Sequence, residues 1–313
     1  MKKVGVIGVG RWGINHVRTY KELYPEHAEL VGISDVDSGK KNIADQHNVK
    51  FFNDYKELTK NVDFVSIVVP TDMHYKVVKD CLLDGTNVLV EKPFVSDPRE
   101  AEELIQLAKD KNLVLYVGYL FRFNPVTIEL KKILPELGEL RAISGRYIQP
   151  NQPRHDSGVV LNLSVHLIDI LNFILPKKPS TVLCKKTNVF STSLEDAATI
   201  TLGYGNFHAT LELSCLHPEK KRDMFILGTN GAVYADFKEQ TLIKYKKPDN
   251  LEDEWSAETV KLDKKEPLKE EIINFLTSTE NEEIRKLGEE EIYTTRICQR
   301  ALESANLGRE LEI

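Results

Sequence analysis

The tripeptide Glu91-Lys92-Pro93 is the sharpest chemical feature of this chain. It follows the apolar residues 87–90, so Lys92 is predicted at the carboxyl end of a buried strand, where Pro93 fixes the turn. A lysine ammonium at that place can donate a hydrogen bond to a substrate hydroxyl and stabilise a developing alkoxide. An exposed lysine in a strand-to-helix loop is the alternative for the tripeptide taken alone.

Glycines near the N-terminus form a second pattern. The apolar residues 4–7 run into the spacing G-x-G-x-x-G, made by Gly8, Gly10, Arg11, Trp12 and Gly13 with one valine between the first two glycines. At a strand-to-helix turn this spacing lets backbone N–H groups bind a dinucleotide pyrophosphate. The pattern therefore predicts a cofactor site; a glycine turn that binds no cofactor is the alternative.

An acid follows the next predicted strand. Asp35 comes directly after residues 29–34. A carboxylate at this position accepts hydrogen bonds from the adenosine ribose hydroxyls and repels a 2′-phosphate. Asp35 thus favours NAD as the cofactor, with NADP as the alternative because Lys40 and Lys41 can soften that repulsion.

More polar residues follow two other predicted strands, at the sheet edge where open parallel sheets bind ligands. They are Pro70, Thr71 and His74 after residues 63–69, and Tyr119, Arg122 and Asn124 after residues 113–117. We expect the first group, with Glu91, to bind the cofactor and the second to bind the substrate. A surface cap at a helix start is the alternative for His74, and a structural residue at a domain hinge is the alternative for Arg122 and Tyr119.

Composition limits the class of protein. The chain has 313 residues, 41% hydrophobic and 29% charged, with a net charge of −6 that disfavours a nucleic-acid surface. No apolar run approaches about 18 residues and no signal-peptide pattern opens the chain, so we expect a cytoplasmic protein. The four cysteines are far apart in the sequence, and we expect them to be buried thiols. No His, Asp, Glu or Cys cluster has metal-ligand spacing, so no metal is expected.

The element pattern predicts two domains. Up to residue 118 apolar strands alternate with helices such as 13–24, 71–83 and 97–112, which is typical of a Rossmann, doubly wound parallel sheet of the α/β class. Residues 119–265 contain short strands with period-two alternation and glycine turns, which predict an α+β domain with an open, largely antiparallel sheet.

Helices are expected at residues 123–134 and 162–175 against that sheet, and at residues 266–276 and 289–307 in the tail.

Together, the glycine pattern, Glu91-Lys92-Pro93 and the stretch of residues 158–169 resemble the glucose–fructose oxidoreductase, inositol dehydrogenase and MocA (Gfo/Idh/MocA) family over nearly the whole chain. Residues 118–125 are most similar to its nucleotide-sugar branch, the UDP-N-acetylglucosamine 3-dehydrogenases. The resemblance implies that Lys92, Asn162 and His166 line the nicotinamide and the oxidised carbinol, and that His74 lies near the nicotinamide ribose. It also implies a cis Lys92-Pro93 bond, a tail (266–313) packed near the first domain, and a homodimer or homotetramer joined through the open sheet.

One position departs from the family pattern. Asn162 stands where the family has Asp, four residues before His166 and thus on the same face of the predicted helix. An Asp would stabilise a protonated His166, whereas Asn can only orient the ring. The alternatives are that Asn162 is a helix N-cap and His166 a satisfied polar residue. Arg154 and His155, in the loop before Gly158, are further candidates for substrate binding.

The resemblance implies a metal-free oxidation of a secondary hydroxyl. His166 takes the hydroxyl proton, Lys92 stabilises the oxygen, and NAD accepts the hydride. We expect the substrate to be a nucleotide sugar such as UDP-N-acetylglucosamine. The alternatives are a polyol, inositol or free-sugar dehydrogenase, and a regulatory protein that holds NAD and a sugar without turnover, a possibility that Asn162 raises.

Overall fold

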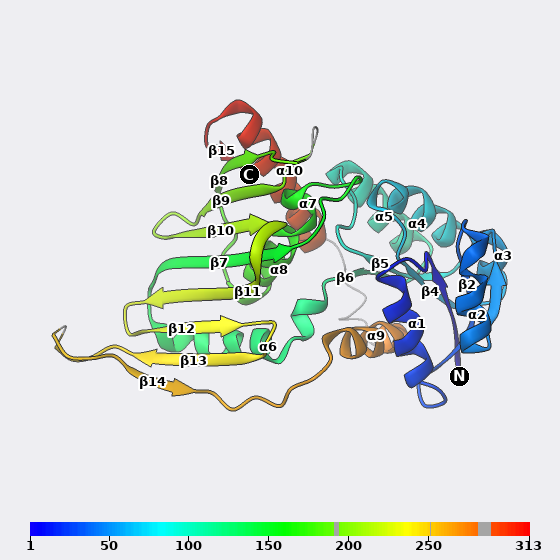
Figure 1. The fold of residues 1–313 in the computed structure, drawn as a ribbon, viewed down its shortest axis with the longest axis horizontal. Coiled ribbons are helices and arrows are strands. Elements are labelled where there is room, and N and C mark those ends of the chain that lie inside the picture. Colours follow the sequence, from blue (N-terminus) through cyan, green and yellow to red (C-terminus); the bar gives the residue numbers. More distant parts are fainter. Residues whose placement is uncertain (191–193, 251, 281–288) are drawn as a thin grey trace. The chain divides into compact units, whose positions relative to one another are not determined.

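The computed structural model describes residues 1–190, 194–250, 252–280 and 289–313 (Figure 1). They form two compact units. The first contains residues 1–119 and 268–295, and the second contains residues 120–267 and 296–313. Each unit has one sheet.

The sheet of the first unit has six parallel strands in the order β3-β2-β1-β4-β5-β6. The predicted Rossmann sheet is therefore confirmed. Its elements are β1 (Lys2–Ile7), α1 (Gly13–Glu22), β2 (Ala28–Ser34), η1 (Ser38–Lys40), α2 (Lys41–His47), β3 (Lys50–Phe52), α3 (Tyr55–Thr59), β4 (Phe64–Ile67), η2 (Thr71–Met73), α4 (His74–Leu83), β5 (Asn87–Glu91), α5 (Pro98–Asp110) and β6 (Leu115–Gly118).

Local signals explain where several of these helices begin. The side chain of Asp54 accepts a hydrogen bond from the Lys56 amide at the start of α3, and Asp97 caps α5 in the same way, with Pro98 in the first turn. The caps fix where the loops after β3 and β5 end and the next helices begin. The loop after β5 carries Lys92.

The tail contributes a helix to the core of the first unit. α9 (Pro267–Thr277) places Ile272 and Phe275 among the buried side chains of β1, β2 and α1. The Phe275 ring meets the Phe64 ring edge-on at 5.4 Å between centroids, and Tyr116 donates a hydrogen bond of 3.0 Å to Asn274. The short η5 (Ser278–Glu280) follows α9.

The second unit contains a nine-stranded sheet in the order β14-β13-β12-β11-β7-β10-β9-β8-β15. It is largely antiparallel, as predicted; the exception is the parallel pairing of β10 with β7. Its elements are η3 (Leu120–Phe123), α6 (Pro125–Ile133), η4 (Leu134–Leu137), β7 (Leu140–Pro150), α7 (Val159–Asn162), α8 (Ser164–Ile174), β8 (Thr181–Thr187), β9 (Ala197–Gly203), β10 (His208–Ser214), β11 (Leu216–Gly228), β12 (Gly231–Asp236), β13 (Thr241–Lys246), β14 (Ser256–Thr259) and β15 (Leu311–Glu312).

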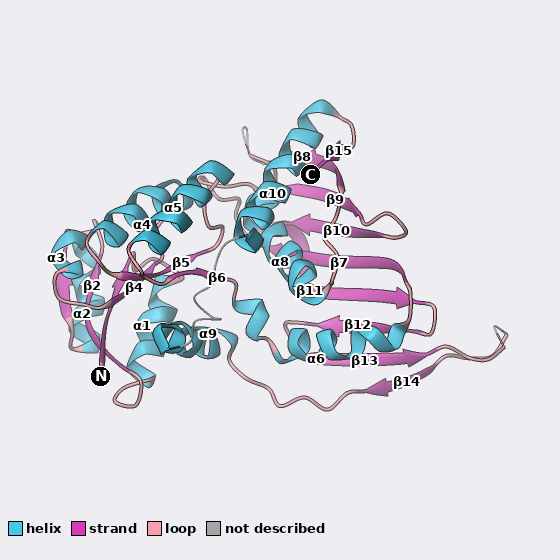
Figure 2. Cartoon of the chain, turned by 180° about the vertical axis from the view of Figure 1, so that it is seen from behind, coloured by secondary structure: helices cyan, strands magenta, loops and turns pink. Residues whose placement is uncertain are grey.

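Figure 2 shows α6 and α8 on one face of this sheet. Along β10, Ala209, Leu211 and Leu213 are buried while the alternating residues are more exposed, as period-two packing against helices requires. A Cβ added at Gly145 of β7 would lie 3.1 Å from the Leu211 side chain of β10, so the neighbouring strand leaves little room for a side chain there. The other face of the sheet carries Thr210 and Glu212.

The structure differs from the prediction in two helical regions. The single helix expected at residues 162–175 is two helices, α7 and α8, separated at Leu163. The tail is divided: α10 (Glu289–Leu307) crosses the boundary between the units, and β15 pairs with β8. Residues 296–313 therefore belong to the second unit and not to the first.

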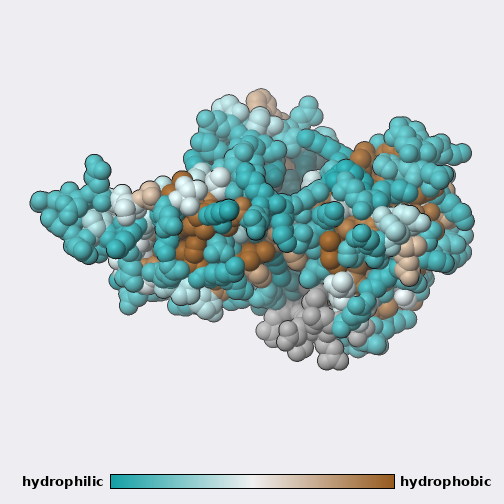
Figure 3. Space-filling model, turned by 90° about the horizontal axis from the view of Figure 1, so that it is seen from below, coloured by the Kyte–Doolittle hydropathy of each residue, from teal (hydrophilic) through white to brown (hydrophobic). Residues whose placement is uncertain are grey.

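The surface in Figure 3 is mostly hydrophilic, with hydrophobic patches. Within the described part of the chain no helix is both long and apolar enough to cross a membrane. All four cysteines are buried and free, as predicted.

Candidate functional site

Two of the three glycines in the N-terminal turn are required by the local backbone, and the third leaves open space. Gly8 has φ +87°, a conformation that side chains rarely adopt, and a Cβ at Gly13 would lie only 2.0 Å from the Gly8 carbonyl oxygen. A Cβ at Gly10 would meet no atom within 4 Å. The backbone at Gly10 is thus open to an approaching group, while Gly8 and Gly13 close the turn behind it. This arrangement fits a bound dinucleotide pyrophosphate.

Asp35, at the end of β2, lies beside that turn. One carboxylate oxygen accepts a hydrogen bond of 2.8 Å from the Val9 amide, and the other accepts one of 2.9 Å from the Asp37 amide. Each oxygen has a further lone pair to offer. The carboxylate is therefore fixed against the glycine turn, where it can accept from ribose hydroxyls.

Four other predicted cofactor residues lie at the starts of helices. Arg11 is exposed and Trp12, the residue before α1, is 40% exposed. Pro70 is exposed and precedes η2, whereas Thr71 is buried as its first residue.

Glu91 is buried at the end of β5 and accepts three hydrogen bonds. Oε1 accepts from Trp12 Nε1 at 2.7 Å and from His16 Nε2 at 3.1 Å, and Oε2 accepts from the Lys92 amide at 3.1 Å. Burial opposes the charge, but the hydrogen bond from His16, the positive charge of Lys92 and the hydrogen bond from Trp12 act against it, so the pKa of Glu91 lies below its ordinary value. Lys92 itself is half-buried.

The sequence analysis did not single out His16. The available signal was its place four residues after Trp12, about one helical turn beyond the N-cap of α1. Their common partner Glu91 is far away in the sequence.

His74 is 1% exposed, so its interpretation as a surface cap is wrong. Nδ1 lies 2.9 Å from the Pro93 carbonyl oxygen and 3.1 Å from that of Phe94, and Nε2 lies 3.0 Å from that of Val69. Burial lowers the pKa of His74, although these hydrogen bonds act in the opposite direction. His74 therefore links the end of β4 to the turn after Lys92, whose bond to Pro93 is cis.

His166 lies in an aromatic cluster of the second unit. Its ring stacks on Tyr147 at 5.1 Å between centroids and 8° between planes, and Phe121 meets it edge-on at 5.1 Å. The guanidinium of Arg222 lies over Tyr147, 4.7 Å from the ring centroid. His166 is 4% exposed, so its ring orientation is fixed by packing and little of it is open.

Asn162 occupies a different place from the one predicted. It is the last residue of α7, whose N-cap is Gly158, and α8 begins two residues later. The interpretation of Asn162 as a helix N-cap is therefore wrong, and it does not share a continuous helical face with His166.

Two predicted substrate residues have partners inside the second unit. Arg122 binds the buried Asp169 of α8 with Nε–oxygen distances of 3.0 Å. The Asn124 side chain caps α6 by accepting from the Val126 amide at 3.0 Å and donates to the Phe237 carbonyl at 2.9 Å. These contacts correspond to structural roles. Tyr119, at the end of the first unit's continuous segment, is buried.

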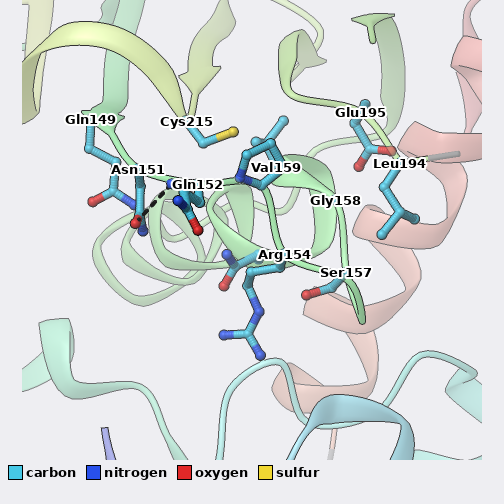
Figure 4. A pocket seen from close by; sticks show the side chains of 12 residues that line it. Gln149, Asn151, Gln152, Arg154, Ser157, Gly158, Val159, Leu194, Glu195 and Cys215 are labelled. Atoms are coloured by element: carbon cyan, nitrogen blue, oxygen red, sulfur yellow. Dashed lines mark hydrogen bonds between the residues drawn. The ribbon is translucent and has the colours of Figure 1, made fainter. Parts of the chain in front are cut away.

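A small pocket of about 10 Å³, shown in Figure 4, lies where the loop before α7 meets residues 194–195. Arg154 and Asn162 line it together with Glu195, which sequence reasoning missed. Glu195 is 6% exposed and accepts a hydrogen bond of 3.0 Å from the Val160 amide. Arg154 binds Asp156 at 2.7 Å.

His155 is exposed and does not line this pocket. Among the residues whose placement is described, no group of three His, Cys, Asp or Glu side chains could hold a metal ion.

Comparison with known proteins places these sites in a family. Residues 2–119 match the model of the oxidoreductase family with an NAD-binding Rossmann fold, and residues 129–234 match the GFO/IDH/MocA C-terminal domain. The chain is 30% identical over 246 residues to UDP-N-acetylglucosamine 3-dehydrogenase of Acidithiobacillus ferrooxidans, covering 78% of this chain and 76% of that protein. Over 184 residues it is 26% identical to scyllo-inositol 2-dehydrogenase (NAD⁺) of Bacillus subtilis, covering 55% and 54%.

Solved structures of sugar dehydrogenases have the same fold as this chain. That of the A. ferrooxidans UDP-N-acetylglucosamine 3-dehydrogenase superposes with a TM-score of 0.84 at 27% identity over 97% of both chains. Levoglucosan dehydrogenase in complex with NADH gives a TM-score of 0.87 at 17% identity over 100% of this chain and 99% of that one, a likeness of fold.

The chain belongs to the Gfo/Idh/MocA family of oxidoreductases. It is a dehydrogenase with an NAD-binding Rossmann domain, and the resemblance noted from its motifs is confirmed.

Proposed function

We propose that this protein is a cytoplasmic enzyme that oxidises a secondary hydroxyl of a nucleotide sugar, namely the 3-hydroxyl of UDP-N-acetylglucosamine. The similarity to UDP-N-acetylglucosamine 3-dehydrogenase carries the proposal, because it extends over 78% of the chain in sequence and 97% in structure. The dehydrogenases of other sugars and polyols match over less of the chain or with lower identity.

NAD is the proposed cofactor. The open backbone at Gly10 would receive its pyrophosphate, and Asp35 would accept from its ribose hydroxyls. When bound, NAD supplies the hydride acceptor. The carboxylate of Asp35 supports NAD over NADP because a 2′-phosphate there would meet a negative charge that is already held in place by two amides.

The chain's own residues have three proposed tasks. Lys92 donates a hydrogen bond to the reacting hydroxyl oxygen and stabilises the negative charge that develops on it. His166 receives the hydroxyl proton, with its ring held by Tyr147 and Phe121. Asn162, Arg154 and His155 remain proposals for orienting the base and the sugar.

Two alternatives remain. A polyol or free-sugar dehydrogenase is supported by the similarity to the inositol 2-dehydrogenase. A protein that binds NAD and a sugar without turnover is supported by Asn162, which supplies no charge to His166. Family membership favours an enzyme.

The test is steady-state NADH formation from NAD with UDP-N-acetylglucosamine, other UDP-sugars, free N-acetylglucosamine and inositols. We expect UDP-N-acetylglucosamine to give the highest kcat/KM. Replacing Lys92 with Met should lower kcat by about 100-fold while NAD affinity stays within about threefold. A higher kcat/KM for an inositol would favour the first alternative, and bound ligand without NADH would favour the second.

A further inference from the structure

Two buried side chains and one partly exposed indole meet beside Lys92 in the first unit. Glu91 is 4% exposed and His16 is fully buried, and Trp12 donates to the same carboxylate oxygen as His16. Gly118, on the neighbouring strand β6, leaves room for it, since an added Cβ would lie 3.2 Å from the Glu91 carboxyl. We call Trp12, His16 and Glu91 the Glu91 cluster.

The polar groups of this cluster are directed at Glu91. A carboxylate only accepts, so the ring nitrogen of His16 that faces it, Nε2, carries the hydrogen. The other ring nitrogen, Nδ1, has no hydrogen-bond partner among the described residues. Among the described residues, the Glu91 carboxylate is thus the hydrogen-bond partner of the His16 ring. Polar groups in protein interiors are normally fully hydrogen-bonded, so a buried imidazole with a single hydrogen bond calls for an explanation.

The cluster connects two parts of the cofactor domain. Trp12 precedes α1 and belongs to the glycine turn, whereas Glu91 ends β5 and accepts from the Lys92 amide. Rotation of the Glu91 side chain would therefore break its hydrogen bonds to Trp12 and to the Lys92 amide together. The bonds from Trp12 and His16 to one oxygen leave the other oxygen directed at the Lys92 amide.

We propose that His16 is a positioning residue that holds Lys92 in its productive place through Glu91. The proposal rests on the proposed role of Lys92 in the oxidation. Trp12 shares this task and ties the position of Lys92 to the turn that receives the cofactor.

A purely structural role for His16 is the competing explanation. It predicts lower stability and proportionate loss of every activity when the ring is removed. A positioning role predicts a loss in kcat that depends on Lys92 being present, with NAD binding little changed.

The experiment compares His16→Leu with His16→Gln, whose amide nitrogen can replace Nε2–H as the donor to Glu91. The assay is NADH formation from NAD and UDP-N-acetylglucosamine. We expect Leu to lower kcat about tenfold with KM for NAD within about twofold, and Gln to recover most of the loss. His47→Leu, on α2 of the same unit, is the matched control and should leave kcat unchanged.

A double-mutant cycle with Lys92→Met decides between the two explanations. If His16 acts through Lys92, His16→Leu should change kcat by less than about twofold in the Lys92→Met background. Additive losses would overturn the proposal and leave the proposed function standing. If Lys92→Met alone has no effect, the proposed function fails first.

A second measurement, the NMR signal of the Trp12 indole N–H, does not depend on enzymatic turnover. In the Trp255→Phe protein, Trp12 supplies the remaining indole N–H resonance. We expect His16→Leu to shift this resonance and speed its exchange with solvent, and His16→Gln to restore both, because the two donors share one oxygen. If His16→Leu changes neither the chemical shift of this resonance nor its rate of exchange with solvent, the proposal is overturned.

Discussion

The Asp35 carboxylate holds the glycine turn through the Val9 amide, and we propose that its charge also selects NAD over NADP. Because it accepts from the Val9 amide, Asp35→Ala should weaken NAD binding as well as relax discrimination against NADP. Asp35→Asn keeps an acceptor for that amide but removes the charge. We therefore expect Asn to reduce the ratio of NADP to NAD dissociation constants by about tenfold with a smaller loss of NAD affinity. Calorimetric titration measures both constants; equal binding of NAD and NADP by the unmodified protein contradicts the assignment.

Asn162 offers a prediction on pH dependence. Since Asn162 is not an N-cap, Asn162→Asp would act through charge and not through helix capping. If His166 is the base and residue 162 faces it, a carboxylate at position 162 should raise the pKa of the imidazolium. The base is active only when neutral, so the acidic limb of the rate profile should move to higher pH.

The measurement is kcat/KM across the pH range, with His166→Ala as the control that removes most turnover while NAD still binds. A profile that responds to neither substitution would place the base elsewhere, with Tyr119 and His155 the next residues to examine.

The ion pair between Arg122 and Asp169 joins η3 to α8. Asp169 is 1% exposed, so Arg122→Ala would remove the guanidinium that pairs with a buried carboxylate, at a cost of about 3–5 kcal/mol. Urea unfolding should show this loss, and the double variant Arg122→Met/Asp169→Leu should recover most of it. Unchanged stability with a raised KM for the nucleotide sugar would instead support the substrate-binding prediction for Arg122.

Elements defined by neighbouring residues were predictable from sequence. The glycine turn, the strands before Asp35 and Lys92, and the Asp54 and Asp97 caps all depend on side chains within a few residues of one another. The break at Leu163 was missed because no Gly or Pro marks it between Val159 and Ile174.

Parts of the candidate site that depend on distant partners were not predictable. His16 is explained by Glu91, 75 residues away, and the Asn124 amide by the Phe237 carbonyl, 113 residues away. Sequence spacing identified the chemical types of residue but not which of them are used inside the fold.

We propose that the face of the nine-stranded sheet that carries Thr210 and Glu212 joins copies of the chain into a dimer or tetramer. This face has a cavity of about 270 Å³ bordered by Arg146, Asp223 and Phe225, and Phe225 is 39% exposed. Aromatic and arginine side chains are both enriched at interfaces between subunits.

Light scattering after gel filtration should therefore show an oligomer that Phe225→Asp shifts to the monomer. Ile128→Asp is the matched control: Ile128 is 42% exposed but lies on α6, which packs on the opposite face of the sheet. A monomeric unmodified protein, or equal effects of both substitutions, would contradict the proposal.

We propose that the protein moves a hydride from C3 of UDP-N-acetylglucosamine to NAD. The most direct measurement uses substrate carrying deuterium at C3 and mass spectrometry of the reduced cofactor. We expect the deuterium to appear in NADH, with transfer strongly reduced in Lys92→Met. NADH that carries no deuterium, or no NADH from this substrate while another sugar or polyol reacts, would contradict the account.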